Sequence, residues 1–136
     1  MDCDRSVKPR VLLADDNQSI IDLVSEVLRS DFEIIGAVLN GAAALEAVEQ
    51  LKPDILVIDI VMPVLDGIET LRRLKRSRII TKIVFLTALE DTSHIREVLE
   101  ASADGFVFKS RLAQDLPQAL QAALGGRHFV SPRDSI

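Results

Sequence analysis

Five side chains that could do chemistry stand at or directly after the ends of apolar segments. Asp15 and Asp16 close RVLLADD, Asp59 closes ILVID, Thr87 lies near the end of KIVFLTA, and Lys109 follows GFVF. Taken singly, each has an ordinary structural role, because an acid can cap a helix, a threonine suits a strand and a lysine can be solvated. Together they make a candidate site of three carboxylates, a hydroxyl and an amine.

Such a set favours phosphoryl chemistry with a divalent cation. Three carboxylates within a few ångströms of one another would repel and raise their pKa values unless a cation lay between them. Mg²⁺ prefers oxygen ligands and keeps several waters, which leaves room for phosphate oxygens. Lys109 would add a fixed positive charge and Thr87 a hydroxyl donor. Asp59 is the central candidate for the nucleophile, which would form an acyl phosphate.

The pattern of apolar residues predicts how these side chains are positioned. We expect strands at 10–16, 32–38, 55–59, 82–88 and 105–110, and helices at 17–30, 41–51, 66–77, 91–103 and 115–126. Because the strands are apolar throughout, they indicate a parallel sheet covered on both faces, an α/β doubly wound fold. Such sheets place functional groups at the carboxyl ends of their strands. Pro117 is expected in the first turn of the last helix.

Composition sets the broad class. The 136 residues fit one domain, and 48% apolar with 27% charged residues is ordinary for a globular protein. No apolar run is long enough for a bilayer span and the N-terminus lacks a signal-peptide core, so we expect a cytoplasmic protein with no membrane partner. Cys3 has no partner for a disulfide or metal cage. With a net charge of −5, DNA binding is expected only through a domain absent from this chain.

The chain resembles the receiver domains of two-component response regulators from about Arg10 to Gly126. The resemblance rests on LLADDN, VIDIVMPVLDG, FLTA and GFVFKS, in this order and on these strand ends. It implies a five-stranded flavodoxin-like (βα)5 sheet of order 2-1-3-4-5. It also implies a signalling switch that accepts a phosphoryl group from a sensor histidine kinase on Asp59. The protein would be no enzyme beyond its own phosphorylation and slow dephosphorylation.

The resemblance also assigns roles to single residues. It implies that Mg²⁺ is held by Asp16, Asp59 and the backbone carbonyl of Val61, and by Asp15 through water. Lys109 would bind the acceptor and then the phosphate. Thr87 would move inward on phosphorylation and the aromatic Phe106 would follow, although an aromatic residue in a strand usually belongs to the core.

The expected output is a partner interaction on the surface of the fourth helix, fifth strand and fifth helix. Candidate contacts there are Arg96, Glu97, Glu100 and Arg111, and homodimerisation on phosphorylation is plausible. Ser110 replaces the proline that often follows the lysine, as is common in the LuxR-type subgroup. The tail LGGRHFVSPRDSI resembles that subgroup's linker to a helix-turn-helix domain. We therefore expect a receiver domain at 1–126 and the start of a linker, or a polar C-terminal tail, at 127–136.

Three other functions share parts of this pattern. A haloacid-dehalogenase-type enzyme needs a second acid two residues after its aspartate, where Val61 stands, and a nucleotide-binding module lacks its glycine-rich motif. A receiver-like interaction module that works without phosphorylation stays open. Since apolar Val61 and Leu89 would not orient an attacking water, we expect slow hydrolysis of the phosphoryl group.

Overall fold

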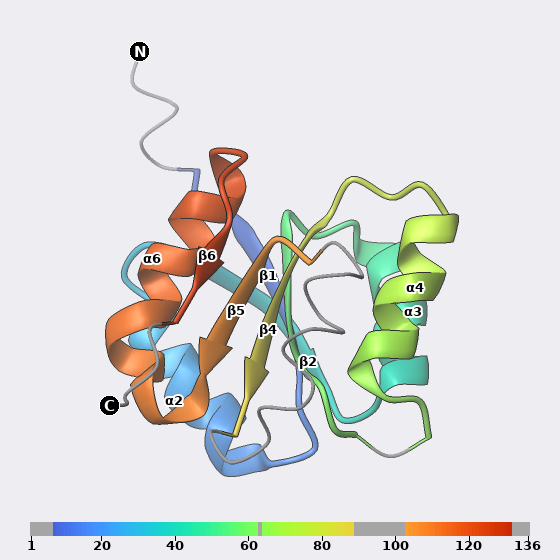
Figure 1. Cartoon of the computed structure of the whole chain (residues 1–136), viewed down its shortest axis with the longest axis horizontal. Helices are drawn as coiled ribbons and strands as arrows, with labels where there is room; N and C mark the ends of the chain where they lie inside the picture. The colour runs from blue at the N-terminus through green and yellow to red at the C-terminus, as the bar shows by residue number, and fades with distance from the viewer. Residues whose placement is uncertain (1–6, 63, 89–102, 132–136) are drawn as a thin grey trace.

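The computed structural model describes residues 7–62, 64–88 and 103–131, which form a sheet between two layers of helices (Figure 1). The strands are β1 (Arg10–Ala14), β2 (Glu33–Val38), β3 (Ile55–Asp59), β4 (Lys82–Thr87), β5 (Gly105–Phe108) and β6 (Phe129–Val130). The helices are α2 (Gln18–Leu28), α3 (Gly41–Leu51), α4 (Gly67–Arg76) and α6 (Leu112–Leu124), with a 3-10 turn η2 (Lys109–Arg111).

The sheet confirms the predicted doubly wound fold. Its order is β2-β1-β3-β4-β5-β6, and every neighbouring pair is parallel. The order therefore reverses beside β1, so the carboxyl ends of β1 and β3 flank the switch point at which such folds bind ligands. The prediction of five strands was wrong by one, since β6 extends the sheet beyond β5.

The sixth strand exists because the end of α6 turns the chain back along the sheet. Gly126 has a positive φ of 79°, and Arg127 donates its backbone N–H to Ala122 across the helix end. This is the glycine-terminated helix cap in which a left-handed residue closes the last turn. The chain that follows is extended, and Phe129–Val130 pairs with Gly105–Phe106 of β5. The sequence showed the glycine stop but not where the next residues would lie.

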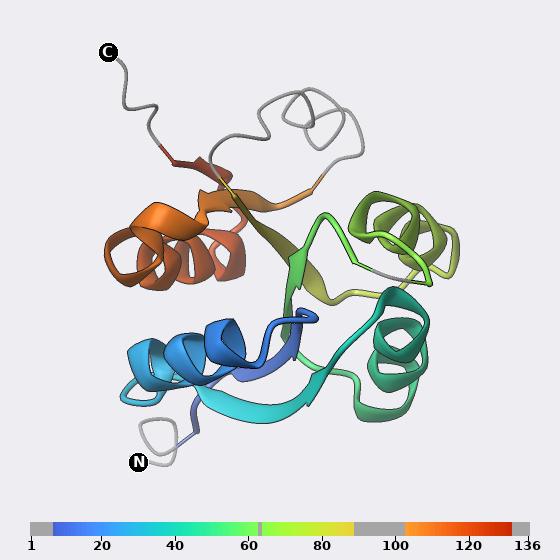
Figure 2. The same ribbon diagram turned by 90° about the horizontal axis from the view of Figure 1, so that it is seen from below.

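Helices cover both faces of the sheet, as the apolar strands predicted. Figure 2 shows α2 and α6 on one face and α3 and α4 on the other. Successive side chains of each strand point to opposite faces of the sheet. Leu12 therefore packs toward α3 and α4, and Leu13 packs toward α2 and α6. Each layer is a continuous apolar core, and the sheet lies between the two.

Side-chain caps fix the helix starts near the site. Asn17 accepts hydrogen bonds from Ser19 and Ile20 at the start of α2, so this residue, rather than Asp15 or Asp16, caps the helix. Asp66 caps α4 through the backbone N–H of Glu69, 2.8 Å away. The two acids of the first strand are thus left for another role.

The last helix starts earlier than expected. α6 begins at Leu112, directly after the η2 turn, which puts Pro117 at its sixth position instead of in its first turn. Proline there removes the hydrogen bond to the carbonyl of Ala113. Because Ala113 is exposed, water can satisfy that carbonyl.

One predicted element falls outside the described residues. Residues 91–102 of the helix expected at 91–103 lie outside the described residues, as does Leu89. That helix and its candidate contacts Arg96, Glu97 and Glu100 therefore stay predictions. Among the helices that the structure does describe, none has the length and apolar character needed to cross a membrane.

Candidate functional site

The carboxyl edge of the sheet brings the predicted carboxylates together. Asp15 follows β1 and donates its backbone N–H to Val38, Asp16 comes next, and Asp59 is the last residue of β3. One carboxylate oxygen from each of the three acids lies within 4.8 Å of the other two. Asp15 and Asp59 are buried and Asp16 is exposed, so the cluster sits at the surface with two acids beneath it.

Lys109 joins both buried acids. Its ammonium nitrogen lies 3.0 Å from Oδ2 of Asp15 and 3.1 Å from Oδ2 of Asp59. The side chain of Lys109 is 21% exposed, whereas those of Asp15 and Asp59 are 6% and 9% exposed. The lysine starts the η2 turn directly after β5, so three strand ends contribute to one charged contact.

Burial and neighbouring charges shift the pKa values of Asp59 and Lys109 by different causes. Burial raises the pKa of Asp59, and the neighbouring charge of Asp15 raises it further, while Lys109 lowers it only in part. Burial by itself would lower the pKa of Lys109, but hydrogen bonds and charges from Asp15 and Asp59 outweigh it and raise that pKa. One amine therefore stays firmly charged between two acids whose combined charge it cannot neutralise.

The donor set fits a hard divalent cation. Oδ1 of Asp15 accepts the backbone N–H of Asn17 at 2.9 Å. Oδ2 of Asp15 is buried and, among the described residues, has no well-formed hydrogen bond beyond its ion pair with Lys109. Oδ1 of Asp59 receives only a long bond, 3.3 Å, from the backbone N–H of Val61. Acidic oxygens with spare lone pairs are the ligands that Mg²⁺ prefers.

The loop after β3 is held close to Asp59 by a glycine. The backbone N–H of Gly67 donates to Ile60 at 2.7 Å. A Cβ at Gly67 would lie 2.3 Å from the carbonyl oxygen of Asp59 and 2.9 Å from the ring of Phe85. At this position glycine is needed for space rather than for a left-handed backbone, since the φ of Gly67 is not positive. The start of α4 can thus pack directly against the residue that carries the carboxylate.

Comparison with known proteins places the chain in a family. The profile of the response regulator receiver domain matches residues 11–121. The chain belongs to this family. It is 34% identical over 100 residues to the chemotaxis protein CheY of Halobacterium salinarum, covering 74% of this chain and 83% of that protein. It is 29% identical over 125 residues to the transcriptional regulatory protein YvfU of Bacillus subtilis, covering 90% of this chain.

Solved structures agree with the assignment. A LuxR-family two-component response regulator from Aurantimonas sp. SI85-9A1 superposes with a TM-score of 0.85 at 26% identity, covering 93% of this chain and 91% of that one. The chain spans 62% of the length of YvfU, so this receiver domain corresponds to only part of such relatives. Receiver domains of two-component systems generally bind Mg²⁺ at an acidic pocket, in keeping with the Asp15, Asp16 and Asp59 cluster.

The two predicted switch residues of this receiver domain lie in neighbouring strands. Thr87 ends β4 and is 1% exposed, and Asp59 pairs with the preceding residue, Leu86, across the sheet. Phe106 is fully buried in β5 and packs edge-to-face on Phe108, with ring centroids 5.3 Å apart. Thr87 thus reaches the carboxyl edge near Asp59, whereas Phe106 lies inside the core.

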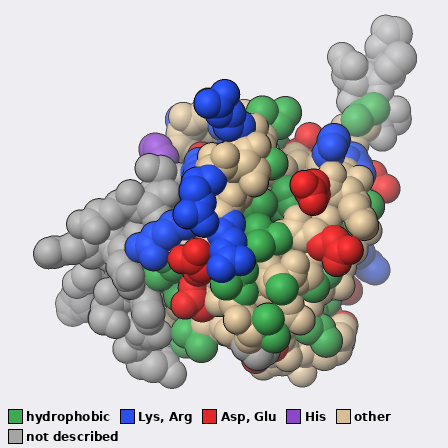
Figure 3. Space-filling view, turned by 90° about the vertical axis from the view of Figure 1, so that its right-hand side faces the viewer, with side chains coloured by type: hydrophobic (Ala, Val, Ile, Leu, Met, Phe, Trp, Pro, Cys, Tyr) green, Lys and Arg blue, Asp and Glu red, His purple; other side chains and the backbone are tan. Residues whose placement is uncertain are grey.

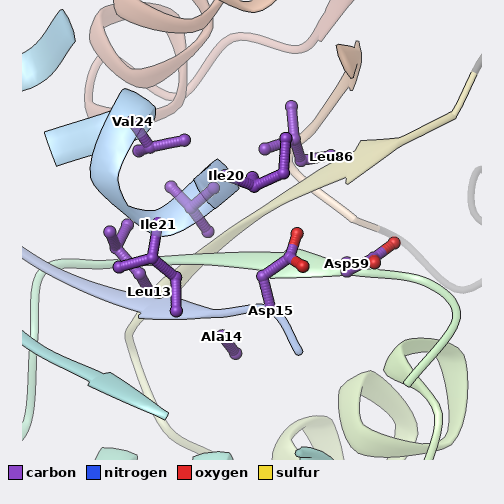
Figure 4. A pocket seen from close by; sticks show the side chains of 9 residues that line it. Leu13, Ala14, Asp15, Ile20, Ile21, Val24, Asp59 and Leu86 are labelled. Carbon is purple, nitrogen blue, oxygen red and sulfur yellow. The ribbon is translucent and has the colours of Figure 1, made fainter. Parts of the chain in front are cut away.

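Sequence reasoning missed an apolar pocket beside the acids of the receiver domain. Figure 4 shows Asp15 and Asp59 at one side of this pocket, with Ile20, Ile21 and Val24 of α2 lining it. Leu13, Ala14, Val57 and Leu86 complete the lining. The helical spacing of the α2 residues marked them as core, but their position over two carboxylates depends on how α2 docks. The pocket gives the acids one apolar wall, consistent with the burial that raises the pKa of Asp59.

A basic stretch at the end of α4 and just beyond it was also missed. Five exposed basic residues occur between positions 72 and 78, namely Arg72, Arg73, Lys75, Arg76 and Arg78. Figure 3 shows Lys and Arg side chains gathered on the face to which α3 and α4 belong. Glu69 pairs with three of them, at 3.2 Å from Arg73, 3.8 Å from Arg76 and 3.9 Å from Arg72. The basic stretch is visible in the sequence as RRLKRSR, but the negative net charge of the whole chain argued against a basic surface.

Proposed function

We propose that this receiver domain is a phosphorylation-dependent switch whose phosphoacceptor is Asp59. The single observation that supports the proposal most is the contact of one lysine with two acids. Lys109 lies 3.1 Å from Asp59 and 3.0 Å from Asp15, and oxygens of Asp15, Asp16 and Asp59 lie within 4.8 Å of one another. A purely structural ion pair would not need a second and third carboxylate at the same point, because unpaired buried charge is costly.

The residues divide the chemistry among them. A carboxylate oxygen of Asp59 attacks the phosphorus of the donor, which for a sensor histidine kinase is a phosphohistidine. A P–O bond to Asp59 forms, the P–N bond to the donor breaks, and the electron pair of that bond leaves with the imidazole nitrogen. Lys109 stays protonated and stabilises the negative oxygens of the phosphoryl group. Mg²⁺, held by Asp16, Asp59 and the carbonyl of Val61, with Asp15 acting through water, would supply further positive charge.

The output follows from a change at two strands. A phosphoryl group on Asp59 offers a new acceptor to the hydroxyl of Thr87, which biases the end of β4, and Phe106 of β5 responds. The affected surface would comprise the predicted fourth helix, β5 and α6. Such a surface can hold a second copy of the chain or an output domain that binds DNA. We place this exchange with a sensor histidine kinase in the cytoplasm and its output in transcription.

The domain boundary predicted at residue 126 stays a prediction. The described fold continues to Ser131, because β6 pairs with β5 beyond that point. Residues 127–136 would then be a linker whose first part is packed on the sheet, leading toward an output domain. The occurrence of transcriptional regulatory proteins among the longer relatives supports this arrangement.

The test is a mass measurement after incubation with Mg²⁺ and acetyl phosphate. The wild type should gain one phosphoryl group and Asp59→Asn should gain none. Asp22→Asn, which alters an exposed aspartate of α2, is the matched control and should react like the wild type. A wild type that stays unmodified, while a kinase or output partner still binds it, would instead support the interaction module that works without phosphorylation.

A further inference from the structure

A buried network of polar side chains lies outside the acidic site and joins η2 and α6 to the residue that follows β6. Asp115 of α6 accepts two hydrogen bonds from Arg111, at 2.7 Å from Nε and 3.2 Å from Nη2. The hydroxyl of Ser131 donates to Oδ2 of the same carboxylate at 2.7 Å. Asp115 and Ser131 are each 3% exposed. We call Arg111, Asp115 and Ser131 the C-terminal clasp.

The clasp holds the turn that carries Lys109 from both sides. The backbone N–H of Phe108, directly before Lys109, donates to the hydroxyl of Ser131 at 3.1 Å. Arg111 is the last residue of the η2 turn that Lys109 begins, and its guanidinium is fixed by Asp115. Lys109 therefore lies in a three-residue turn whose entry and exit are both tied to the clasp.

Ser131 reaches this position through the sixth strand. β6 ends at Val130, so the ladder between β5 and β6 offers no carbonyl to Phe108. The backbone N–H of Ser131 donates to Phe106 at 2.9 Å, and its side chain then takes the N–H of Phe108. The hydroxyl of Ser131 thus accepts the N–H of Phe108 where the ladder supplies no carbonyl, and it also donates a hydrogen bond to Asp115.

The clasp is a costly arrangement to maintain. A buried carboxylate needs both charge and hydrogen-bond partners, and removing one partner leaves the others unsatisfied. Burial by itself would raise the pKa of Asp115, but the hydrogen bonds from Arg111 and Ser131 and the charge of Arg111 lower it. An apolar contact would hold α6 against β6 without the cost of a buried polar group that loses its partner. We therefore look for a role of the polar network other than packing.

We propose that the C-terminal clasp positions Lys109 for phosphoryl binding and links the acidic site to the chain that follows β6. This inference rests on the proposed function, in which Lys109 binds the phosphoryl group. When Lys109 moves toward a phosphoryl group on Asp59, the η2 turn moves with it. Phe108 and Arg111 then transmit that movement to Ser131. Arg111, Asp115 and Ser131 are positioning residues, since they act on the site through Lys109 and touch neither Asp59 nor Asp15.

The first experiment observes Lys109 directly and needs no phosphorylation. NMR signals of its side-chain ammonium and Cε are compared in the wild type, Ser131→Ala and Asp115→Asn at one pH. Ser131→Thr, which keeps the hydroxyl, is the conservative variant. Thr81→Val is the matched control, because it removes a buried hydroxyl bond of 2.8 Å to Pro53. Thr81 lies directly before β4, at the amino ends of the strands and so away from the acidic site.

The two clasp variants should move the Lys109 signals toward those of the exposed lysines Lys8 and Lys75, and Ser131→Thr should retain the wild-type signals. Thr81→Val should lower the melting temperature by a similar amount and leave Lys109 unchanged. Wild-type Lys109 signals in both Ser131→Ala and Asp115→Asn would overturn the positioning role, and the clasp would then be only a structural fastening.

The second experiment measures the function of the clasp. The rate of phosphorylation by acetyl phosphate with Mg²⁺ should fall about tenfold in Ser131→Ala and Asp115→Asn, because a slightly misplaced group loses much of its effect. Thr81→Val and Ser131→Thr should react at the wild-type rate. Equal rates in all variants would contradict the proposal. A wild type that is never phosphorylated would refute the proposed function instead, and the Lys109 signals would then decide about the clasp alone.

The link to the chain end has its own readout. Binding of beryllofluoride with Mg²⁺, a mimic of the phosphoryl group, should shift the backbone amide signals of Phe129, Val130 and Ser131 in the wild type. The same addition should leave those signals unmoved in Asp115→Asn. If the mimic binds the wild type and the three amides do not respond, the site and the chain end are not linked.

Discussion

Lys109 lies as close to Asp15 as to Asp59, with its ammonium nitrogen 3.0 Å from one carboxylate and 3.1 Å from the other. Both contacts are made to Oδ2 atoms of the carboxylates that also belong to the candidate metal cluster. A divalent cation bound there would therefore compete with Lys109 for the charge of the same two acids. The amine of Lys109 pairs with both acids, and a cation bound to them would be repelled by that amine.

Replacing Lys109 should therefore strengthen binding of Mg²⁺. Lys109→Met keeps the length of the side chain and removes its charge, so the carboxylates lose a competing cation. We expect affinity for Mg²⁺ to rise roughly tenfold, which is about 1.4 kcal/mol. Isothermal titration calorimetry is the measurement, because the chain has no tryptophan or tyrosine to report binding by fluorescence. Lys75→Met, on the exposed face of α4, should bind Mg²⁺ as the wild type does, and weaker binding by Lys109→Met would contradict the competition.

Asp59 should make the unliganded protein less stable as the pH rises. Burial raises the pKa of Asp59 above its ordinary 3.8, so between 3.8 and the raised value the folded state binds more protons than the unfolded state. The free energy of unfolding then falls with increasing pH across that window. The Asp59→Asn variant has no carboxyl group to ionise there, so its unfolding free energy does not fall in this way. It should be more stable than the wild type at neutral pH, by about 0.5–3 kcal/mol. Urea unfolding at several pH values, without divalent cations, measures the difference.

Asp115 supplies a control of opposite sign for that series. Because its partners lower the pKa of Asp115, its contribution to stability is present above the ordinary value of 3.8 and is lost as the pH falls through the lowered value. Asp115→Asn should thus be destabilised at neutral pH and approach the wild type in acid. The raised pKa of Lys109 affects stability only above about pH 10.5, so it leaves both comparisons undisturbed. Equal pH profiles for Asp59→Asn and the wild type would exclude the buried-charge explanation.

The candidate site could be predicted from the sequence because parallel strands fix where it must lie. Asp15, Asp59, Thr87 and Lys109 each end or follow an apolar run, and the carboxyl ends of parallel strands meet at one edge. What could not be predicted was which atoms would pair. The contact of Lys109 with two acids depends on the register of three strands and on the η2 turn, and none of these leaves a local sequence pattern.

The parts that were missed involve contacts between segments far apart in the chain. Ser131 reads as a tail residue, and its bond to Phe108 exists only because the cap at Gly126 turns β6 onto β5. Gly67 reads as a turn glycine, yet it is required by the closeness of α4 to β3. Local propensity is informative about elements, whereas docking distances are properties of the assembled fold.

Adding a methyl group at Gly67 should destabilise the fold. A Cβ there would lie 2.3 Å from the carbonyl oxygen of Asp59 and 3.0 Å from Cα of Ile60, and neither backbone atom can move freely. Gly67→Ala should lose about 1–3 kcal/mol of unfolding free energy. Gly36→Ala is the matched control, because its Cβ would meet the end of the Leu12 side chain at an ordinary 3.4 Å. Similar urea midpoints for the two variants would refute the steric explanation.

The phosphoryl group on Asp59 should be long-lived, because Val61 cannot orient an attacking water. Val61 follows Asp59 by two residues, donates its backbone N–H to that carboxylate and has an exposed side chain. Val61→Asn offers a polar group at the same place and should speed loss of the phosphoryl group roughly tenfold. Ile80→Asn, at a residue that is 93% exposed, is the control. Mass spectrometry at successive times measures the lifetime of the phosphoryl group, and a half-life of seconds in the wild type would contradict this prediction.

Val64 should be a site where glycine stabilises the protein. Its φ is 70°, a left-handed conformation that costs a β-branched residue about 1–2 kcal/mol, and its side chain is 79% exposed, so little packing compensates. Val64→Gly relieves that strain, although glycine also loses about 0.5–1 kcal/mol through greater freedom of the unfolded chain. A net gain of about 0.5–1 kcal/mol in unfolding free energy is therefore expected from the difference of these two terms. Val7→Gly, at a residue that is 72% exposed with an ordinary φ, should give no gain. If urea unfolding shows Val64→Gly losing stability as ordinary valine-to-glycine changes do, the loop after Asp59 is not strained at this position.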